Sequence, residues 1–106
     1  MNPNRIQYLN TLLAETPEDP FLYYALGLEY LRPEPEKAKE YFELVFSTFP
    51  EYLPNYFQLG TILAELDQKE KALDVFEKGV AKAKQLQDQH TLAELQSAYQ
   101  NLLMED

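Results

Sequence analysis

An internal repeat constrains the fold of this chain more than any other feature of its sequence. Two segments share a pattern of aromatic, leucine and glycine residues at an offset of 33: Tyr23, Ala25, Leu26, Gly27 and Tyr30 correspond to Tyr56, Gln58, Leu59, Gly60 and Leu63. Two more segments correspond at an offset of 34: Ala38, Tyr41, Phe42 and Glu43 match Ala72, Val75, Phe76 and Glu77. A fixed period of roughly 20–50 residues indicates supersecondary units that stack on one another.

Two helices are predicted in each unit, because helix-starting residues precede the amphipathic stretches. Proline can occupy the first helical position, where its missing N–H is harmless, at Pro3, Pro20, Pro35 and Pro54. Asn2 and Asp19 stand immediately before two of these prolines, and their side chains are suited to capping. Pro33 is expected to end the helix that precedes it.

Two pairs with capping-box spacing predict the remaining helix starts. They are Asp67 with Glu70 and Thr91 with Glu94. Six helices are therefore expected, near residues 3–15, 20–31, 35–48, 53–66, 68–87 and 91–104. No segment shows sustained strand alternation, so the predicted class is all-α.

With these residues placed, the sequence resembles the tetratricopeptide repeat family, whose pattern is W-x2-L-G-x2-Y, then A-x3-F, then P. The first repeat supplies Tyr23 in place of tryptophan, then Leu26, Gly27, Tyr30, Ala38, Phe42 and Pro50; the second supplies Tyr56, Leu59, Gly60, Leu63, Ala72 and Phe76. The resemblance implies a right-handed α-α superhelix of antiparallel helix pairs. We expect one domain over 1–106, with a half-repeat helix at 3–15, repeats at 20–50 and 53–84, and a capping helix at 91–104.

The glycines of the pattern also have a physical interpretation. Gly27 and Gly60 fall inside predicted helices, where glycine costs about 1 kcal/mol relative to alanine. Close approach of a neighbouring helix would compensate, with Ala38 and Ala72 as the expected small partners. Aromatic residues are then expected to fill the space between successive hairpins, namely Tyr23, Tyr30, Phe42, Tyr56 and Phe76.

The last predicted helix departs from the repeat pattern. Leu92, Leu95, Tyr99 and Leu102 keep the apolar spacing of a first helix, but Gln96 occupies the position of the glycine. Terminal repeats of solenoids need a more polar outer face, and four amide side chains can supply it: Gln89, Gln96, Gln100 and Asn101. We expect this helix to be a cap and the chain to be complete.

Composition argues against several classes of function. The 9 basic against 18 acidic side chains, a formal net charge of −9, disfavour nucleic acid and anionic membranes as partners. The chain has no cysteine, no phosphate-binding glycine loop and no nucleophile motif. Its one histidine, His90, is expected in a surface turn. We therefore expect no enzymatic activity, no cofactor and no metal. With no signal-like or membrane-spanning stretch, the expected location is the cytoplasm.

The resemblance implies that a peptide binds the concave face lined by the first helices of the repeats. Helical geometry selects the candidates for that face: Phe21, Tyr24, Leu28, Leu31, Phe57, Thr61, Ala64, Gln96 and Gln100. Relatives that clamp a carboxylate use lysine and asparagine there. The matching neighbourhood contains no lysine, so an apolar or basic segment is the expected partner.

Three interpretations of this face stay open at this point. The first is an adaptor or scaffold whose face binds a protein or peptide. The second is self-association, in which a second subunit covers Phe21, Tyr24 and Phe57; the chain's own N-terminal helix could cover the same residues instead. The third is an accessory subunit that stabilises a larger partner.

Overall fold

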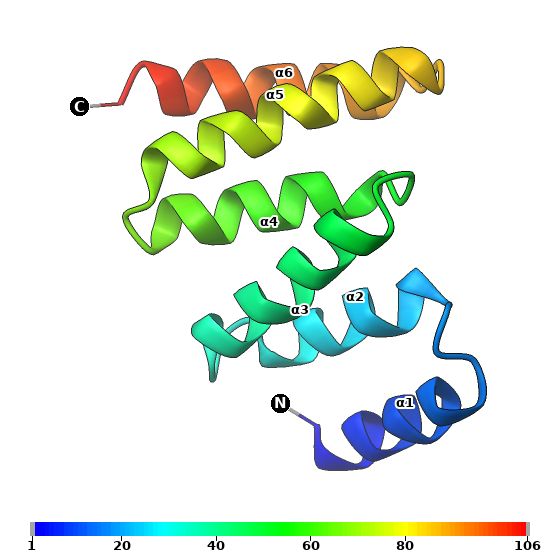
Figure 1. The fold of residues 1–106 in the computed structure, drawn as a ribbon. Helices are drawn as coiled ribbons and strands as arrows, with labels where there is room; N and C mark the ends of the chain where they lie inside the picture. The colour runs from blue at the N-terminus through cyan, green and yellow to red at the C-terminus, as the bar shows by residue number, and fades with distance from the viewer. Residues whose placement is uncertain (1, 106) are drawn as a thin grey trace. The chain divides into compact units, whose positions relative to one another are not determined.

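The computed structural model describes residues 2–105 and shows six helices there (Figure 1). They are α1 (Pro3–Glu15), α2 (Pro20–Tyr30), α3 (Pro35–Thr48), α4 (Pro54–Glu65), α5 (Lys69–Gln85) and α6 (Gln89–Leu103). Residues 2–105 contain no strand. The predicted all-α class and the six helices are confirmed, each helix end lying within a few residues of its predicted position. None of these six helices combines the length and the hydropathy needed to span a bilayer.

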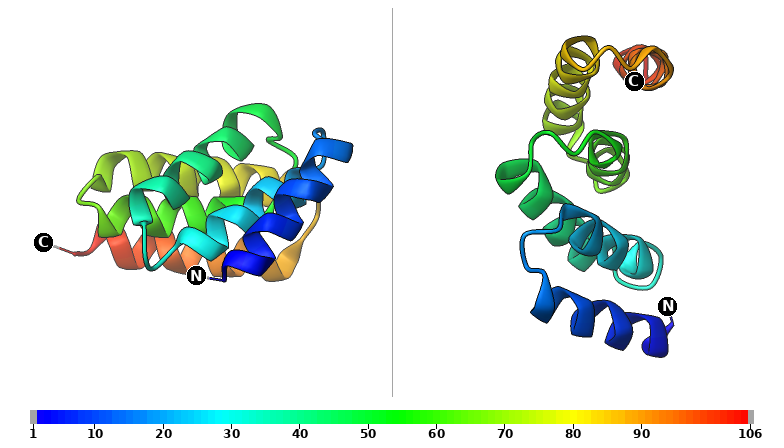
Figure 2. Two further views of the ribbon diagram at one scale, coloured as in Figure 1. Left: turned by 90° about the horizontal axis from the view of Figure 1, so that it is seen from below. Right: turned by 90° about the vertical axis from the view of Figure 1, so that its right-hand side faces the viewer.

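The chain divides into two compact units, Met1–Tyr52 and Leu53–Asp106. In the first unit, α2 packs against both α1 and α3. In the second, each of the three helices contacts the other two, and α4 and α6 lie on the same side of α5 (Figure 2). Because α4, α5 and α6 alternate in direction, α4 and α6 run parallel. The division falls between the two predicted repeats.

The proline-led helix starts are confirmed. The Asn2 side chain accepts a hydrogen bond from the Arg5 N–H at 3.1 Å, which caps α1. The Asp19 side chain accepts one from the Phe21 N–H at 3.0 Å, which caps α2. The first helical positions of α1 to α4 are all occupied by proline. These helix starts depend on local interactions, because each capping side chain satisfies an N–H group that its own helix leaves without a partner.

The two predicted capping boxes are wrong. Asp67 has a left-handed backbone with φ 60°, and the Gln68 N–H donates to the Leu63 carbonyl at 2.8 Å. This pattern is a Schellman motif, so Asp67 closes α4 instead of opening α5. Thr91 lies inside α6, and its N–H donates to the Asp88 carboxylate at 3.0 Å.

Asp88 is thus the N-cap that starts α6. The Thr91 backbone N–H, and secondarily the Thr91 hydroxyl, hold the pKa of the Asp88 carboxyl below its usual value. The same segment repeats the Schellman closure, because Gln87 has φ 58° and the Asp88 N–H donates to the Ala83 carbonyl at 3.0 Å. One short turn therefore ends α5 and begins α6.

In the α2–α3 and α4–α5 hairpins, an aromatic ring packs against a glycine. A Cβ added to Gly27 would lie 2.8 Å from Cδ1 of Phe42, and one added to Gly60 would lie 2.6 Å from Cδ1 of Phe76. Real Cβ atoms essentially never lie closer than about 3 Å to such an atom, so alanine at either position would force the phenylalanine ring to shift. The nearest neighbours of the two glycines are the phenylalanine rings and not the expected alanines, although Ala38 and Ala72 are fully buried.

Phe42 and Phe76 therefore fill their own hairpins, contrary to the expectation that they pack between hairpins.

A third glycine, Gly79, works in the same way inside the second unit. A Cβ there would lie 2.8 Å from Cβ of Tyr56 and 2.9 Å from Cδ1 of Leu95. It lets α5 approach both α4 and α6 closely.

Helix α1 is attached to α2 by apolar and ionic contacts. Leu9 is buried in one cluster with Leu22, Ala25 and Leu26. At the surface, Arg5 Nε lies 2.9 Å from a carboxylate oxygen of Glu29. The half-repeat helix predicted at 3–15 thus forms and packs on the first helix of the following hairpin.

Candidate functional site

The predicted face of α2 is partly open. Phe21 is 48% exposed and Leu28 is 38% exposed, and their spacing of seven residues puts them on one side of the helix. Tyr24 is half-buried, with its ring centroid 5.8 Å from that of Phe42 and 5.4 Å from that of Tyr52. Leu31 is half-buried at the C-cap. Helix α1 therefore does not cover Phe21.

In the second unit, Thr61 and Ala64 line a groove between α4 and α6. The groove has a volume of about 340 Å³ and is lined by Thr61, Ala64, Glu65, Phe76, Ala98, Asn101, Leu102 and Glu105. We call it the α4–α6 groove. Short side chains from both helices leave it open, and Phe76, buried on α5, contributes an aromatic surface. The next predicted residue, Phe57, lies one turn earlier on α4 with its ring centroid 6.4 Å from that of Phe76.

One end of the α4–α6 groove is acidic. Glu65 is the last residue of α4, and Glu105 follows the end of α6. Because α4 and α6 run parallel, the partial negative charges of both helix C-termini gather at this end. Lys69 Nζ donates to the backbone carbonyl of Glu105, so one cation already lies there. No lysine or arginine lines the groove.

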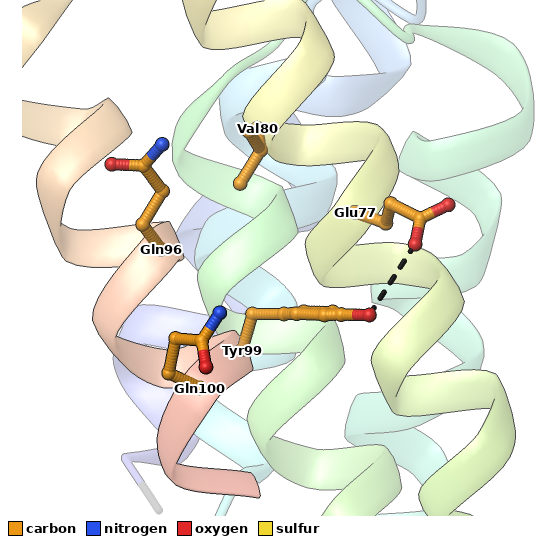
Figure 3. A pocket seen from close by; sticks show the side chains of 5 residues that line it. All are labelled: Glu77, Val80, Gln96, Tyr99 and Gln100. Carbon is orange, nitrogen blue, oxygen red and sulfur yellow. Dashed lines mark hydrogen bonds between the residues drawn. The ribbon is translucent and has the colours of Figure 1, made fainter. Parts of the chain in front are cut away.

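The other two predicted residues of this unit lie elsewhere. Gln96 and Gln100 line a second groove with Glu77, Val80 and Tyr99, which we call the α5–α6 groove; its volume is about 200 Å³. Figure 3 shows Tyr99 reaching from α6 towards Glu77 on α5, where its hydroxyl donates to a carboxylate oxygen at 3.5 Å. Gln96 is two residues from Ala98, about 200° around the helix, so the amides do not extend the surface made by Thr61 and Ala64.

Within residues 2–105, no group of three or more His, Cys, Asp and Glu side chains is placed to hold a metal ion. His90 is exposed in the first turn of α6. The chemistry available in both grooves is apolar contact, hydrogen bonding and charge.

The sequence analysis missed the α6 wall of the α4–α6 groove. No sequence motif marks the residues of this wall, which are Ala98, Asn101 and Glu105. Only the packing of α6 on α4 brings them opposite Thr61 and Ala64. Their one sequence signal is the spacing 98, 101, 105, which places them on one side of a helix.

Solved structures resemble this chain closely. The solution structure of a tetratricopeptide repeat domain protein from Salinibacter ruber is 35% identical, with a TM-score of 0.78, over 84% of this chain and 92% of that one. A crystal structure of a tetratricopeptide repeat domain protein from the same organism is 33% identical, with a TM-score of 0.78, over 81% and 98%. A Bordetella parapertussis protein is 25% identical, with a TM-score of 0.79, over 95% and 89%. No protein-family model and no curated protein matches the sequence.

Proposed function

The chain belongs to the tetratricopeptide repeat family, and from this membership we propose that it is a non-catalytic adaptor whose α4–α6 groove binds a peptide segment of another protein. The observation that carries the proposal is the groove itself. It is walled by the short side chains of Thr61, Ala64 and Ala98, backed by Phe76, and ends in an acidic patch. Concave surfaces that combine apolar contact with a few polar groups are typical of ligand sites.

The groove favours an apolar segment that carries a basic side chain. Phe76, Ala98 and Leu102 offer apolar contact, while the Asn101 amide can both donate to and accept from a peptide backbone. Glu65 and Glu105 attract a lysine or arginine at the open end. Acidic segments would be repelled there, in keeping with the net charge of −9.

Fluorescence anisotropy with two labelled peptides tests this proposal. The peptides have the same length and alternate leucine and alanine with either lysine or glutamate. The lysine peptide should bind at least about tenfold more tightly, which corresponds to about 1.4 kcal/mol. Its binding should weaken as salt rises, because added ions screen the acidic end.

Two variants with the same chemical change locate the site. Ala98→Arg fills the α4–α6 groove and should reduce binding of the lysine peptide at least about tenfold. Ala14→Arg adds the same side chain at an exposed position of α1 and should bind the peptide like the wild type. Equal binding of both peptides, or an Ala98→Arg variant that is folded and binds normally, would refute the proposal.

Self-association through α2 is a second candidate function, favoured by the exposed Phe21 and Leu28. Apolar side chains that remain in water can be buried by a second subunit. Sedimentation of a Phe21→Ser/Leu28→Ser variant tests this interpretation. A wild-type dimer that becomes a monomer in this variant supports it, and an unchanged mass contradicts it.

A further inference from the structure

The side of α6 that lines the α5–α6 groove corresponds, by the repeat, to the side of α2 and of α4 on which the second helix of the same hairpin packs. Gly27 of α2 faces Phe42 of α3, and Gly60 of α4 faces Phe76 of α5. The matching residue of α6 is Gln96, and its side chain lines the α5–α6 groove. A phenylalanine ring cannot approach this longer polar side chain as it approaches glycine. Any surface that docks here must therefore satisfy amide groups as well as apolar ones.

Two helices contribute to this surface, which we call the end face. It consists of Glu77, Val80 and Lys84 from α5 and Gln96, Tyr99, Gln100 and Leu103 from α6. Five of these residues line the groove. Lys84 and Leu103 extend the face, because each lies seven residues from a lining residue of its own helix and hence on the same side. Leu103 is 49% exposed.

The charges of the end face are complementary to those of a second copy turned by half a revolution. The chain as a whole carries −9, yet among the seven residues named above one is acidic, Glu77, and one is basic, Lys84. The Lys84 ammonium lies in no ion pair within residues 2–105. Glu77 and Lys84 flank Val80 on α5, so an antiparallel second α5 would place each charge opposite its counterpart.

We propose that a second copy of this chain docks on the end face, with α5 antiparallel to α5 of the partner. A two-fold interface uses the same patch on both subunits, and Val80 then lies near the axis. Glu77 pairs with Lys84 of the partner subunit, and Lys84 pairs with Glu77 of the partner subunit. Gln96 and Gln100 suit such an interface because an amide both donates and accepts hydrogen bonds, and so complements its own kind.

Sedimentation equilibrium across a concentration series, at about 0.15 M ionic strength, tests this arrangement. The wild type should show a reversible monomer–dimer equilibrium. Glu77→Lys and Lys84→Glu each replace two attractive pairs by two repulsive ones, and each should raise the dissociation constant at least about tenfold. The double variant Glu77→Lys/Lys84→Glu restores both pairs and should dimerise like the wild type.

A mixture of the two single variants is the most discriminating measurement, because the attractive charge pairs can form only between the two variants. Glu77→Lys supplies two lysines and Lys84→Glu supplies two glutamates, so the mixture should form a heterodimer more tightly than either variant forms its own dimer. Circular dichroism on every variant controls for folding, since Glu77 also accepts a hydrogen bond from Tyr99.

Three results would overturn the proposal. They are a monomeric wild type at all concentrations, a dimer that is insensitive to both charge reversals, and a dimer that the Phe21→Ser/Leu28→Ser variant abolishes. Peptide binding to the α4–α6 groove is measured separately, so failure of either proposal leaves the other standing.

Discussion

Gly60→Ala should destabilise the second unit, although alanine is the better helix former. In an open helix this change gains about 1 kcal/mol. Here the new methyl group would lie 2.6 Å from Cδ1 of Phe76, whose side chain is 3% exposed and has little room to move. Overpacking of a tight core costs about 1–3 kcal/mol. Subtracting the gain leaves an expected net loss of up to about 2 kcal/mol, or up to roughly 15 °C in Tm.

Urea unfolding followed by circular dichroism measures this loss and its cause. Phe76→Leu alone should also destabilise, by about 1–2 kcal/mol. If the ring causes the clash, the double variant Gly60→Ala/Phe76→Leu should be more stable than the sum of the two single changes by about 2 kcal/mol. Ser97→Ala, at an exposed helical position, should gain slightly by propensity. A Gly60→Ala variant that is more stable than the wild type would refute the reasoning.

Three further predictions concern the helix ends. Gln87→Gly should raise the free energy of unfolding by about 0.5–1 kcal/mol, because glycine tolerates the left-handed backbone at φ 58°; Gln85→Gly, in the last turn of α5, should lower it in the same urea experiment. The Asp88 cap stabilises above the unfolded carboxyl pKa, about 3.9, and that contribution disappears as pH falls through the lowered folded pKa. Tm of wild type should therefore fall more steeply in acid than Tm of Asp88→Asn. Glu29→Ala should cost less than about 1 kcal/mol by thermal unfolding, because its pair with Arg5 is at the surface.

Helix starts were predictable where a single residue decides them. Proline at the first helical position and the Asn2 or Asp19 side chain before it act within one turn. The capping boxes failed because the turns between helices serve two purposes. The same few residues must close one helix and open the next, and at Asp67 the closing Schellman motif prevails. A three-residue spacing cannot reveal which of the two competing arrangements forms.

The glycine positions were predictable, but their partners were not. A glycine inside a helix indicates a close neighbour because its cost must be offset. We expected a small residue opposite it, on the idea that two small residues bring backbones together. The structure instead places a phenylalanine ring over Gly27 and over Gly60. A ring fills the space that a missing side chain leaves, whereas alanine opposite glycine would leave a void.

The repeat alignment also explains why the candidate surface was only partly found. An alignment of repeats identifies residues at equivalent positions of two helices. A groove between those helices is lined by residues at positions that are not equivalent. On α4 the wall of the α4–α6 groove is Thr61 and Ala64, whereas on α6 it is Ala98 and Asn101. Gln96 was chosen by its register and lies on the opposite side of α6, in the α5–α6 groove.

Substitutions on the two sides of α6 should therefore affect different properties of the protein. Gln96→Arg alters the end face, so it should raise the dissociation constant of the dimer at least about tenfold. It should leave binding of the lysine peptide intact. Ala98→Arg should do the reverse, because it alters only the α4–α6 groove. Sedimentation and anisotropy on both folded variants measure the two effects. If one variant changes both properties, the two grooves are not independent sites, and peptide binding and self-association must be assigned to a shared surface.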